Sequence, residues 1–100
     1  MTLTSLHRLF IANRGEIACR IIRTAKEMGI TTCVGYSEAD ANARFVRMAD
    51  EAVLLGPAEP AKSYLDVTKV IEAAQELQAD AVHPGFGFLS ENTDFAKACE

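Results

Sequence analysis

Residues 9–36 read LFIANRGEIACRIIRTAKEMGITTCVGY, and this stretch decides the fold. It begins with a short continuous apolar run, residues 9–12, of the kind expected for a strand that is buried on both faces. A segment with helical periodicity follows, and residues 30–36 are rich in β-branched side chains, which is typical of a second strand. A strand, a helix and a strand in this order predict a βαβ unit with parallel strands.

The helix of this unit is expected to be amphipathic. Asn13 and Glu16 stand three residues apart, which is the spacing of a capping box at a helix start. Gly29 is expected just past the helix end, where the backbone turns left-handed. The apolar residues recur at helical spacing and are expected to pack on the sheet; they are Ile17, Ala18, Ile21, Ile22, Ala25 and Met28.

The opposite face of this helix is charged. Glu16 with Arg20, and Arg23 with Glu27, have the i,i+4 spacing of helical ion pairs. A solvated helix face is the ordinary interpretation, because exposed pairs contribute only about 0.2–1 kcal/mol each. Arginine is also favoured in ion pairs between subunits, so a dimer contact through Arg20, Arg23 and Glu27 is the second interpretation.

The alternation of strand and helix patterns continues along the rest of the chain. Residues 37–50 predict a short helix, residues 51–55 a third strand and residues 58–63 a loop. Residues 79–82 predict a fourth strand, and a further helix is expected from about residue 93. Between the third and fourth strands, Asp66 or Ser63 is expected to cap a helix whose buried stripe is Val67, Val70, Ile71, Ala74 and Leu77.

These patterns predict one α/β domain over residues 1–100, Rossmann-like, with three layers and a parallel sheet. Right-handed crossovers and the usual strand order, 3-2-1-4, place the first and fourth strands side by side. That junction is the topological switch point, where ligands bind at the carboxyl ends of the strands. The loop with Asn13, Arg14 and Gly15 and the loop over residues 83–92 are therefore expected to flank one crevice.

The second of these loops reads HPGFGFLSEN. Pro84 ends the preceding strand, because it cannot donate to a sheet ladder. Gly85 and Gly87 allow another group to approach the backbone closely, and Phe86 between them needs a partner that covers its ring. Phe86 is the best candidate for contact with a ligand, and packing against a neighbouring domain remains the alternative.

The polar residues of this loop have ordinary explanations as well. His83 is a possible general acid or base, but no nucleophile or carboxylate pair stands near it in sequence, so a hydrogen-bonded structural role is favoured. Glu91 and Asn92 are expected to cap the last helix, although both would face the crevice. No complete catalytic constellation and no metal-binding spacing is present in the sequence.

A dinucleotide site at the first turn is disfavoured. Such a site needs G-x-G-x-x-G so that the backbone can approach a pyrophosphate, whereas Asn13-Arg14-Gly15-Glu16 has one glycine and adds a negative charge. Glu38, at the end of the second strand, occupies the position of the ribose-binding acid of that motif. Alone it is a weak signal, because charged residues commonly follow strands.

Composition excludes further classes of function. A net charge of −4 argues against nucleic acid and membrane surfaces as partners, since both require a basic face. Cys19, Cys33 and Cys99 lack the spacing of a zinc or redox motif and are expected to be free thiols. With no secretory signal visible, free thiols indicate a reducing, cytoplasmic location.

Several stretches of the sequence resemble the start of the biotin carboxylases. The first is IANRGEIA at residues 11–18, which continues with RIIR at residues 20–23. The second is HPG at residues 83–85 with GFLSEN at residues 87–92. Shorter matches are ADEA at residues 49–52 and SYL at residues 63–65, so the resemblance covers nearly the whole chain.

This resemblance implies a function that the residues alone do not establish. The intact enzymes use ATP, magnesium and bicarbonate to carboxylate biotin on a biotin carboxyl carrier protein, and a carboxyltransferase completes the reaction. The chain resembles only their amino-terminal domain, a Rossmann-like pre-ATP-grasp fold, so it is expected to be a fragment that is inactive alone. Its partners are then the remaining biotin carboxylase domains and, in the intact enzyme, a second copy.

The resemblance also gives roles to particular residues. Phe86 and Gly87 match positions near the biotin pocket, where the family most often has tyrosine in place of Phe86, so a polar role of that side chain is in doubt. Arg23 and Glu27 match positions at the homodimer interface. Two alternatives remain open: the same module of a pyruvate carboxylase, and a stand-alone Rossmann-like module that binds a nucleotide or a protein.

Overall fold

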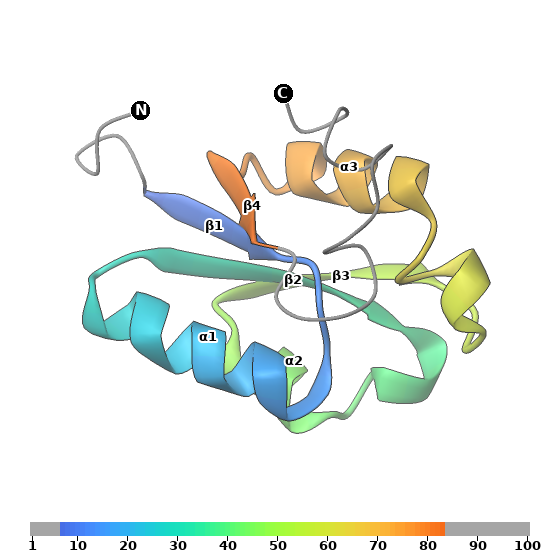
Figure 1. The fold of residues 1–100 in the computed structure, drawn as a ribbon, viewed down its shortest axis with the longest axis horizontal. Helices are drawn as coiled ribbons and strands as arrows, with labels where there is room; N and C mark the ends of the chain where they lie inside the picture. The colour runs from blue at the N-terminus through green and yellow to red at the C-terminus, as the bar shows by residue number, and fades with distance from the viewer. Residues whose placement is uncertain (1–6, 84–100) are drawn as a thin grey trace.

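Four parallel strands form one sheet in the order β3-β2-β1-β4, as the sequence predicts. The computed structural model describes residues 7–83 of the chain. The strands are β1 (Arg8–Ile11), β2 (Thr31–Ser37), β3 (Glu51–Gly56) and β4 (Ala81–His83). Figure 1 shows that α1 (Gly15–Glu27) and α2 (Arg44–Met48) cover one face of the sheet and that α3 (Val67–Glu76) covers the other. The expected three-layer α/β architecture is confirmed within this range.

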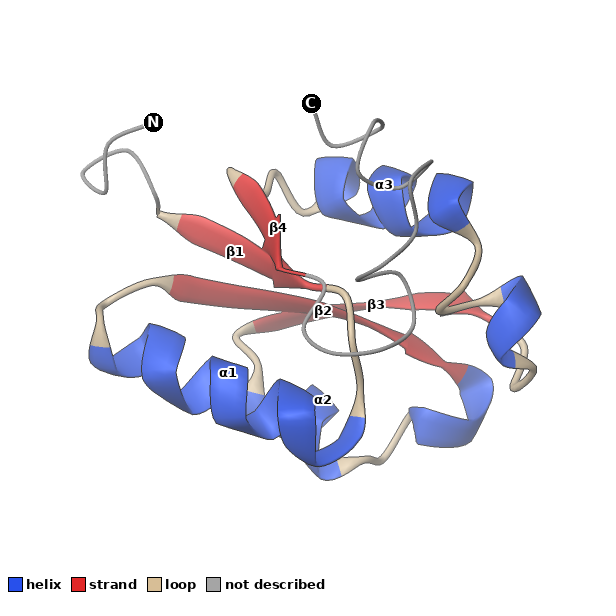
Figure 2. Cartoon of the chain, viewed as in Figure 1, coloured by secondary structure: helices blue, strands red, loops and turns tan. Residues whose placement is uncertain are grey.

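The central strands are the most deeply buried part of the fold. Phe10 and Ile11 of β1, and Cys33 and Val34 of β2, are completely inaccessible to solvent. Strands covered on both faces need continuous apolar runs, which explains why residues 9–12 and 30–36 carry the strongest strand signals in the sequence. In Figure 2 these two strands lie between the helical layers.

The start of α1 differs from the expected capping box. The N-cap residue is Arg14, and no side chain caps the helix. Asn13 is buried, and its Oδ1 atom accepts a hydrogen bond of 2.8 Å from the backbone N–H of Arg14. Because the helix begins one residue later than expected, Glu16 is its second residue and cannot complete the box with Asn13, so that prediction is wrong.

The end of α1 follows the prediction. Gly29 has a φ of +77°, and its N–H donates to the carbonyl of Lys26. The N–H of Ile30 donates to the carbonyl of Ala25 over 3.0 Å. These two bonds form a Schellman motif, which satisfies carbonyls of the last turn that have no partner within the helix.

The buried face of α1 is narrower than its apolar stripe. Ala18, Ile22 and Ala25 are buried as expected, whereas Ile17 is 39% and Met28 59% exposed. Among the described elements, α1 packs mainly against α2, β1 and β2. Neither Glu16–Arg20 nor Arg23–Glu27 is among the ion pairs of residues 7–83, although all four side chains are exposed there.

The connections on the far side of β2 are also close to expectation. The short helix expected in residues 37–50 appears as a 3-10 turn, Glu38–Asp40, followed by α2. The expected loop over residues 58–63 contains a second 3-10 turn, Pro60–Lys62, because proline presets the backbone for a first helical position. Asp66 caps α3, and its carboxylate accepts a hydrogen bond of 3.1 Å from the N–H of Lys69.

The amino edge of the sheet is held together by charged groups. Arg8 forms an ion pair with Glu51 and donates from Nε to the carbonyl of Leu77 over 2.9 Å. The Asp80 carboxylate accepts hydrogen bonds of 2.8 Å from the N–H groups of His7 and Arg8.

In residues 7–83, no helix has the length and apolar character that crossing a membrane would require.

Candidate functional site at the carboxyl edge of the sheet

The two strands that lead into the predicted crevice end side by side. Ile11 of β1 pairs with His83 of β4, and the N–H of Ala12 donates to the carbonyl of His83 over 2.8 Å. The predicted adjacency of the first and fourth strands is therefore confirmed. The rest of the second loop lies outside the described residues, and with it the candidate residues Gly85, Phe86, Gly87, Glu91 and Asn92.

The first loop, residues 13–15, is a shaped turn. Asn13 is only 2% exposed, so its side chain supports the turn from inside. Gly15 has a φ of +67°, and a Cβ atom there would meet nothing within 4 Å. The glycine is thus required by backbone conformation rather than by close packing. Arg14, between them, points its side chain toward the loops that follow the next two strands.

Arg14, Asp40 and Tyr64 form a cluster that joins three loops of this edge. Both oxygens of Asp40 accept hydrogen bonds of 2.7 Å from the Arg14 guanidinium. The Tyr64 hydroxyl donates to Asp40 over 2.5 Å and accepts from the backbone N–H of Ser37 over 3.1 Å. The guanidinium carbon of Arg14 lies 5.6 Å from the centre of the Tyr64 ring, which adds a cation–π contact.

The charges of the cluster stabilise one another. Hydrogen bonds from Arg14, and then from Tyr64, lower the pKa of Asp40 below its ordinary value, although burial opposes the shift. The same ion pair raises the pKa of Arg14. Burial, followed by the hydrogen bond to Asp40, raises the pKa of Tyr64. Asp40 is therefore a carboxylate and Tyr64 a neutral phenol at neutral pH.

This arrangement suits positioning rather than proton transfer. A general base needs a pKa near the working pH, whereas Asp40 is held ionised by a bidentate arginine. The cluster connects the loops after β1, β2 and β3, so it holds these three loops together. Within residues 7–83, no group of three or more His, Cys, Asp or Glu side chains is placed to hold a metal ion.

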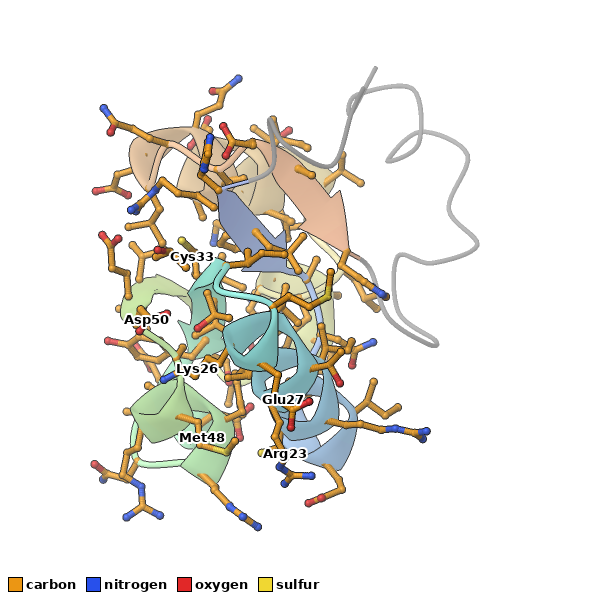
Figure 3. All side chains as sticks on the ribbon, turned by 90° about the vertical axis from the view of Figure 1, so that its left-hand side faces the viewer. Arg23, Lys26, Glu27, Cys33, Met48 and Asp50 are labelled. Atoms are coloured by element: carbon orange, nitrogen blue, oxygen red, sulfur yellow. The ribbon has the colours of Figure 1, made fainter. Side chains whose placement is uncertain are left out.

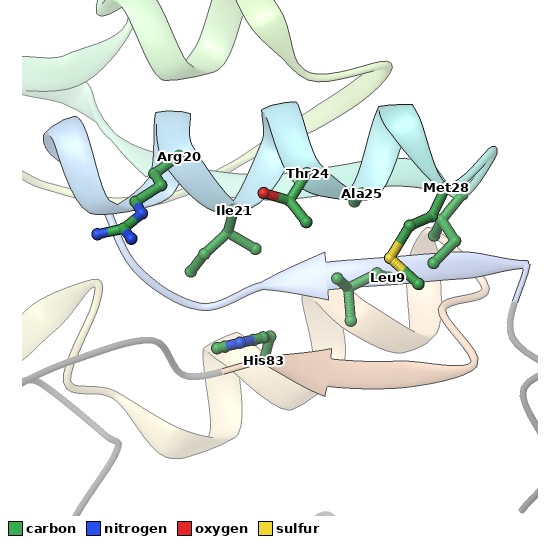
Figure 4. A pocket seen from close by; sticks show the side chains of 8 residues that line it. Leu9, Arg20, Ile21, Thr24, Ala25, Met28 and His83 are labelled. Atoms are coloured by element: carbon green, nitrogen blue, oxygen red, sulfur yellow. The ribbon is translucent and has the colours of Figure 1, made fainter.

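Among the described residues, cavities lie along both sides of α1. One, of about 370 Å³, is lined by His83, Arg20, Thr24 and apolar residues of β1, α1 and the turn between α1 and β2 (Figure 4). The other, of about 480 Å³, lies between α1 and α2 and is lined by Arg23, Lys26, Glu27, Arg47 and Met48 (Figure 3). The role of His83, as a general acid or base or as a structural residue, stays a prediction, because the described residues do not distinguish between the two.

The candidate interface residues do not belong to the carboxyl-edge cluster. Arg20, Arg23 and Glu27 are exposed on α1, where Arg20 borders the first cavity and Arg23 and Glu27 border the second. Lys26, next to them, lies 3.6 Å from the Asp50 carboxylate, which ties α1 to the start of β3. Arg20 lines the same cavity as His83, so a contact surface on α1 that includes Arg20 would adjoin the predicted crevice rather than lie apart from it.

Sequence reasoning singled out Arg14 but missed its partners. Asp40 lies in a polar stretch after β2, and no local pattern distinguishes it from the exposed Glu38. Tyr64 is far from both in sequence, although an aromatic residue between a proline-containing turn and a helix cap is a usable signal. Ion pairs between residues 26 positions apart depend on strand order, so only the tertiary structure brings them together.

Comparison with known proteins places this geometry in context. The profile of the family described as "Biotin carboxylase, N-terminal domain" matches residues 5–100. The chain is 55% identical over 96 residues to the methylcrotonoyl-CoA carboxylase subunit alpha, mitochondrial, of Mus musculus, covering 96% of this chain. It is also 55% identical over 95 residues to biotin carboxylase 1 of Bacillus subtilis, covering 95% of this chain. These relatives do not favour the pyruvate carboxylase alternative.

A solved structure of similar fold is the biotin carboxylase domain dimer of the Hydrogenobacter thermophilus 2-oxoglutarate carboxylase, in complex with MgADP, ADP and bicarbonate. The TM-score is 0.88 and the identity 48%, and the match covers 94% of this chain and 20% of that one. The chain spans only 13% of the mouse protein and 21% of the Bacillus protein.

Proposed function

Because this chain belongs to the family of biotin carboxylase amino-terminal domains, we propose that it is the first part of a longer ATP-dependent ligase. That enzyme uses ATP and bicarbonate to carboxylate biotin on a carrier protein, as the first half-reaction of an acyl-CoA carboxylase. The family match over residues 5–100 carries this proposal. The chain spans about a fifth or less of its relatives, so most of the active site belongs to other polypeptide.

The described residues do not fit a site for magnesium or for ATP phosphates. Asp40 is committed to Arg14, and the first turn of α1 carries the acidic Glu16 where a phosphate would bind. No metal-binding group of side chains occurs in residues 7–83. We therefore assign magnesium and ATP to the remaining domains, and to this chain the role of one wall of the cleft.

In this assignment the two loops of the carboxyl edge face the substrates. Phe86 and Gly87 are proposed to lie on the biotin side. The wall itself is formed by Asn13, Arg14, Gly15, His83, Gly85, Glu91 and Asn92. The adjacency of β1 and β4 supports this, because it starts both loops from one point of the sheet. The Arg14–Asp40–Tyr64 cluster would hold the first loop in place.

The proposed partners follow from membership of the same family. They are the remaining biotin carboxylase domains, a biotin carboxyl carrier protein, a carboxyltransferase and a second copy that contacts Arg20, Arg23 and Glu27. The exposure of these three side chains supports a contact role. We propose a cytoplasmic location, with a mitochondrial one as the alternative, since the mouse relative is named as mitochondrial.

The test is an activity measurement on two forms of the protein. The full-length protein that contains this chain should hydrolyse ATP in a bicarbonate-dependent manner and carboxylate free biotin, whereas residues 1–100 alone should do neither. Full-length protein that shows neither activity would contradict the proposal. Bicarbonate-dependent hydrolysis by residues 1–100 at a comparable rate would contradict the assignment of the chemistry to other domains.

Calorimetric titration distinguishes the proposed enzyme fragment from the alternative, a stand-alone module that binds a nucleotide. A stand-alone module would bind ATP or NAD saturably at the crevice of residues 1–100. The proposed fragment should bind ATP, NAD and biotin only weakly, because it holds few of the contacts that each ligand needs. The full-length protein serves as the positive control for ATP.

A further inference from the structure

The Arg14 side chain joins the turn over residues 13–15 to two parts of the chain that are distant in sequence. Asp40, in the 3-10 turn after β2, accepts two hydrogen bonds of 2.7 Å from the guanidinium. Tyr64, just before α3, places the centre of its ring 5.6 Å from the guanidinium carbon. A bidentate carboxylate and an aromatic face together restrict the arginine to one orientation. The orientation of the turn therefore depends on residues outside it.

Exposure decreases along the cluster from Arg14 to Tyr64. The side chain of Arg14 is 45% exposed and that of Asp40 10%, while Tyr64 is only 3% exposed as a whole residue. At the inner end, the Tyr64 hydroxyl accepts a hydrogen bond of 3.1 Å from the N–H of Ser37. With so little exposed surface, Tyr64 has almost no area that a substrate could contact. Any effect of Tyr64 on a reaction must therefore pass through Asp40 and Arg14.

The position of the cluster in the fold gives this support a functional meaning. It connects the loops after β1, β2 and β3 at the carboxyl edge of the sheet, the edge at which parallel α/β sheets bind ligands. Burying an ionised carboxylate is costly, and apolar side chains of similar volume often stabilise a fold as well or better. A buried polar network accepts only the arrangement in which each hydrogen bond is made, so it specifies one geometry. A loop beside reacting groups requires this property.

We propose that Tyr64 is a positioning residue for the carboxylation of biotin. Through Asp40 it holds Arg14, and with it the turn over residues 13–15, in the orientation in which this turn completes the crevice wall. The inference rests on the proposed function, which places this turn beside the substrates. Loosening the turn should slow turnover without weakening the binding of ATP, whose contacts we assign to the remaining domains. A displacement of about 1 Å at a reaction site can cost up to roughly 100-fold in rate.

Tyr64→Phe in the full-length protein is the direct test. The substitution keeps the ring and removes the hydroxyl, so Asp40 and Arg14 lose the group that anchors them to Ser37. The kcat of biotin carboxylation at saturating substrates should fall at least about fivefold, while the KM for ATP should stay within about twofold. A kcat within about twofold of the wild-type value would overturn the proposal.

The control is a variant of comparable stability, because a smaller folded fraction would also reduce the apparent kcat. Gly29→Ala, at the other end of α1, should destabilise the protein without touching the cluster. All variants are assayed at a temperature at which circular dichroism shows them fully folded. Gly29→Ala should then keep its kcat within about twofold of the wild-type value. A loss as large as that in Tyr64→Phe would contradict the inference, because stability alone would explain both.

A double-mutant cycle tests whether Tyr64 acts through Arg14. Arg14→Lys keeps the positive charge but lacks the fork that binds Asp40 at two points, so it should lower kcat by itself. Adding Tyr64→Phe to Arg14→Lys should reduce kcat by less than about twofold more, since the anchor has nothing left to orient. A second loss of about fivefold would refute a route through Arg14. If Tyr64→Phe does not yield folded protein, Arg14→Lys still decides, and an unchanged kcat there would end the proposal.

Hydrogen exchange of residues 12–16, followed by mass spectrometry, reports the order of the turn independently of activity. Tyr64→Phe should exchange these amides at least about threefold faster than the wild-type protein, and Gly29→Ala should not. Equal exchange in Tyr64→Phe and wild type would refute the inference. Wild-type protein without biotin carboxylation would contradict the proposed function. An active wild type, with faster exchange but unchanged kcat in Tyr64→Phe, would contradict this inference alone.

Discussion

The Tyr64 hydroxyl links two buried partners in the carboxyl-edge cluster. It donates to Asp40 and accepts from the N–H of Ser37, and both partners are buried. Tyr64→Phe keeps the ring but leaves that N–H without its acceptor. We expect the free energy of unfolding in urea to fall by about 1–3 kcal/mol, the usual penalty for an unsatisfied buried polar group.

Tyr36→Phe is the matched control. Tyr36 lies in the adjacent β2 strand and is only partly buried, so the same removal should change the free energy of unfolding by less than about 0.5 kcal/mol. Equal effects at the two positions would show that the cluster contributes nothing specific.

Asp40 makes the stability of the protein depend on pH. The Arg14 guanidinium holds the pKa of Asp40 below its ordinary value, so the folded state binds the proton less tightly than the unfolded state. Its contribution is fully present above the unfolded pKa, near 3.9, and is lost as the pH falls through the lower folded pKa. Urea unfolding between about pH 5 and pH 2 should show a decrease that Asp40→Asn makes shallower.

The control for this measurement is an exposed carboxylate. Glu72→Gln, on the outer side of α3, removes the same charge without touching the cluster and should leave the pH dependence nearly unchanged. Asp40→Asn should also lower stability at pH 7 by about 1–2 kcal/mol, a modest value because Arg14 is half exposed and screened by water. An unchanged pH profile in Asp40→Asn would contradict the assigned ion pair.

Among the elements, α1 and α3 end with the same backbone motif but different residues. Gly29 after α1 has a φ of +77°, and Gln78 after α3 has a φ of +56°. A left-handed conformation costs a residue with a Cβ atom about 1–2 kcal/mol. Gly29→Ala should therefore lower the free energy of unfolding by about 1 kcal/mol or more, and Gln78→Gly should raise it by up to about 1 kcal/mol.

Steric clash does not contribute to the expected cost of Gly29→Ala. A Cβ atom at Gly29 would meet nothing within 4 Å, so the cost is conformational alone. Gly29→Asn tests this, because asparagine tolerates the left-handed region and should cost less than alanine. Equal losses for asparagine and alanine in chemical denaturation would contradict a conformational cause.

For the whole molecule, the open surfaces of residues 7–83 indicate low stability when the chain is alone. Met28, Leu54 and Leu65 are 59%, 50% and 40% exposed, and β3 and β4 are both edge strands within this range. We expect residues 1–100 to unfold with a free energy below about 5 kcal/mol or to self-associate. Urea denaturation with analytical ultracentrifugation checks this, and a monodisperse monomer with a high melting temperature would contradict it.

The sequence by itself determined the order of the elements and the sheet. Residues 9–12 and 30–36 are buried on both faces in β1 and β2, and a strand that is covered on both sides leaves a continuous apolar run that can be recognised locally. Gly29 and Asp66 marked a helix end and a helix start for a similar reason, since both roles depend on neighbouring backbone atoms only. The order 3-2-1-4 then followed from the handedness of the crossovers.

Only the tertiary structure decided which polar groups meet and which apolar groups stay uncovered. Asp40 and Tyr64 reach Arg14 because strand order brings the ends of β1, β2 and β3 together, and no local pattern records that approach. Ile17 and Met28 belong to the same periodic stripe as Ala18 and Ile22, yet the described residues leave them 39% and 59% exposed. Periodicity reports that a side chain prefers burial, whereas the neighbours that bury it are set by packing in three dimensions.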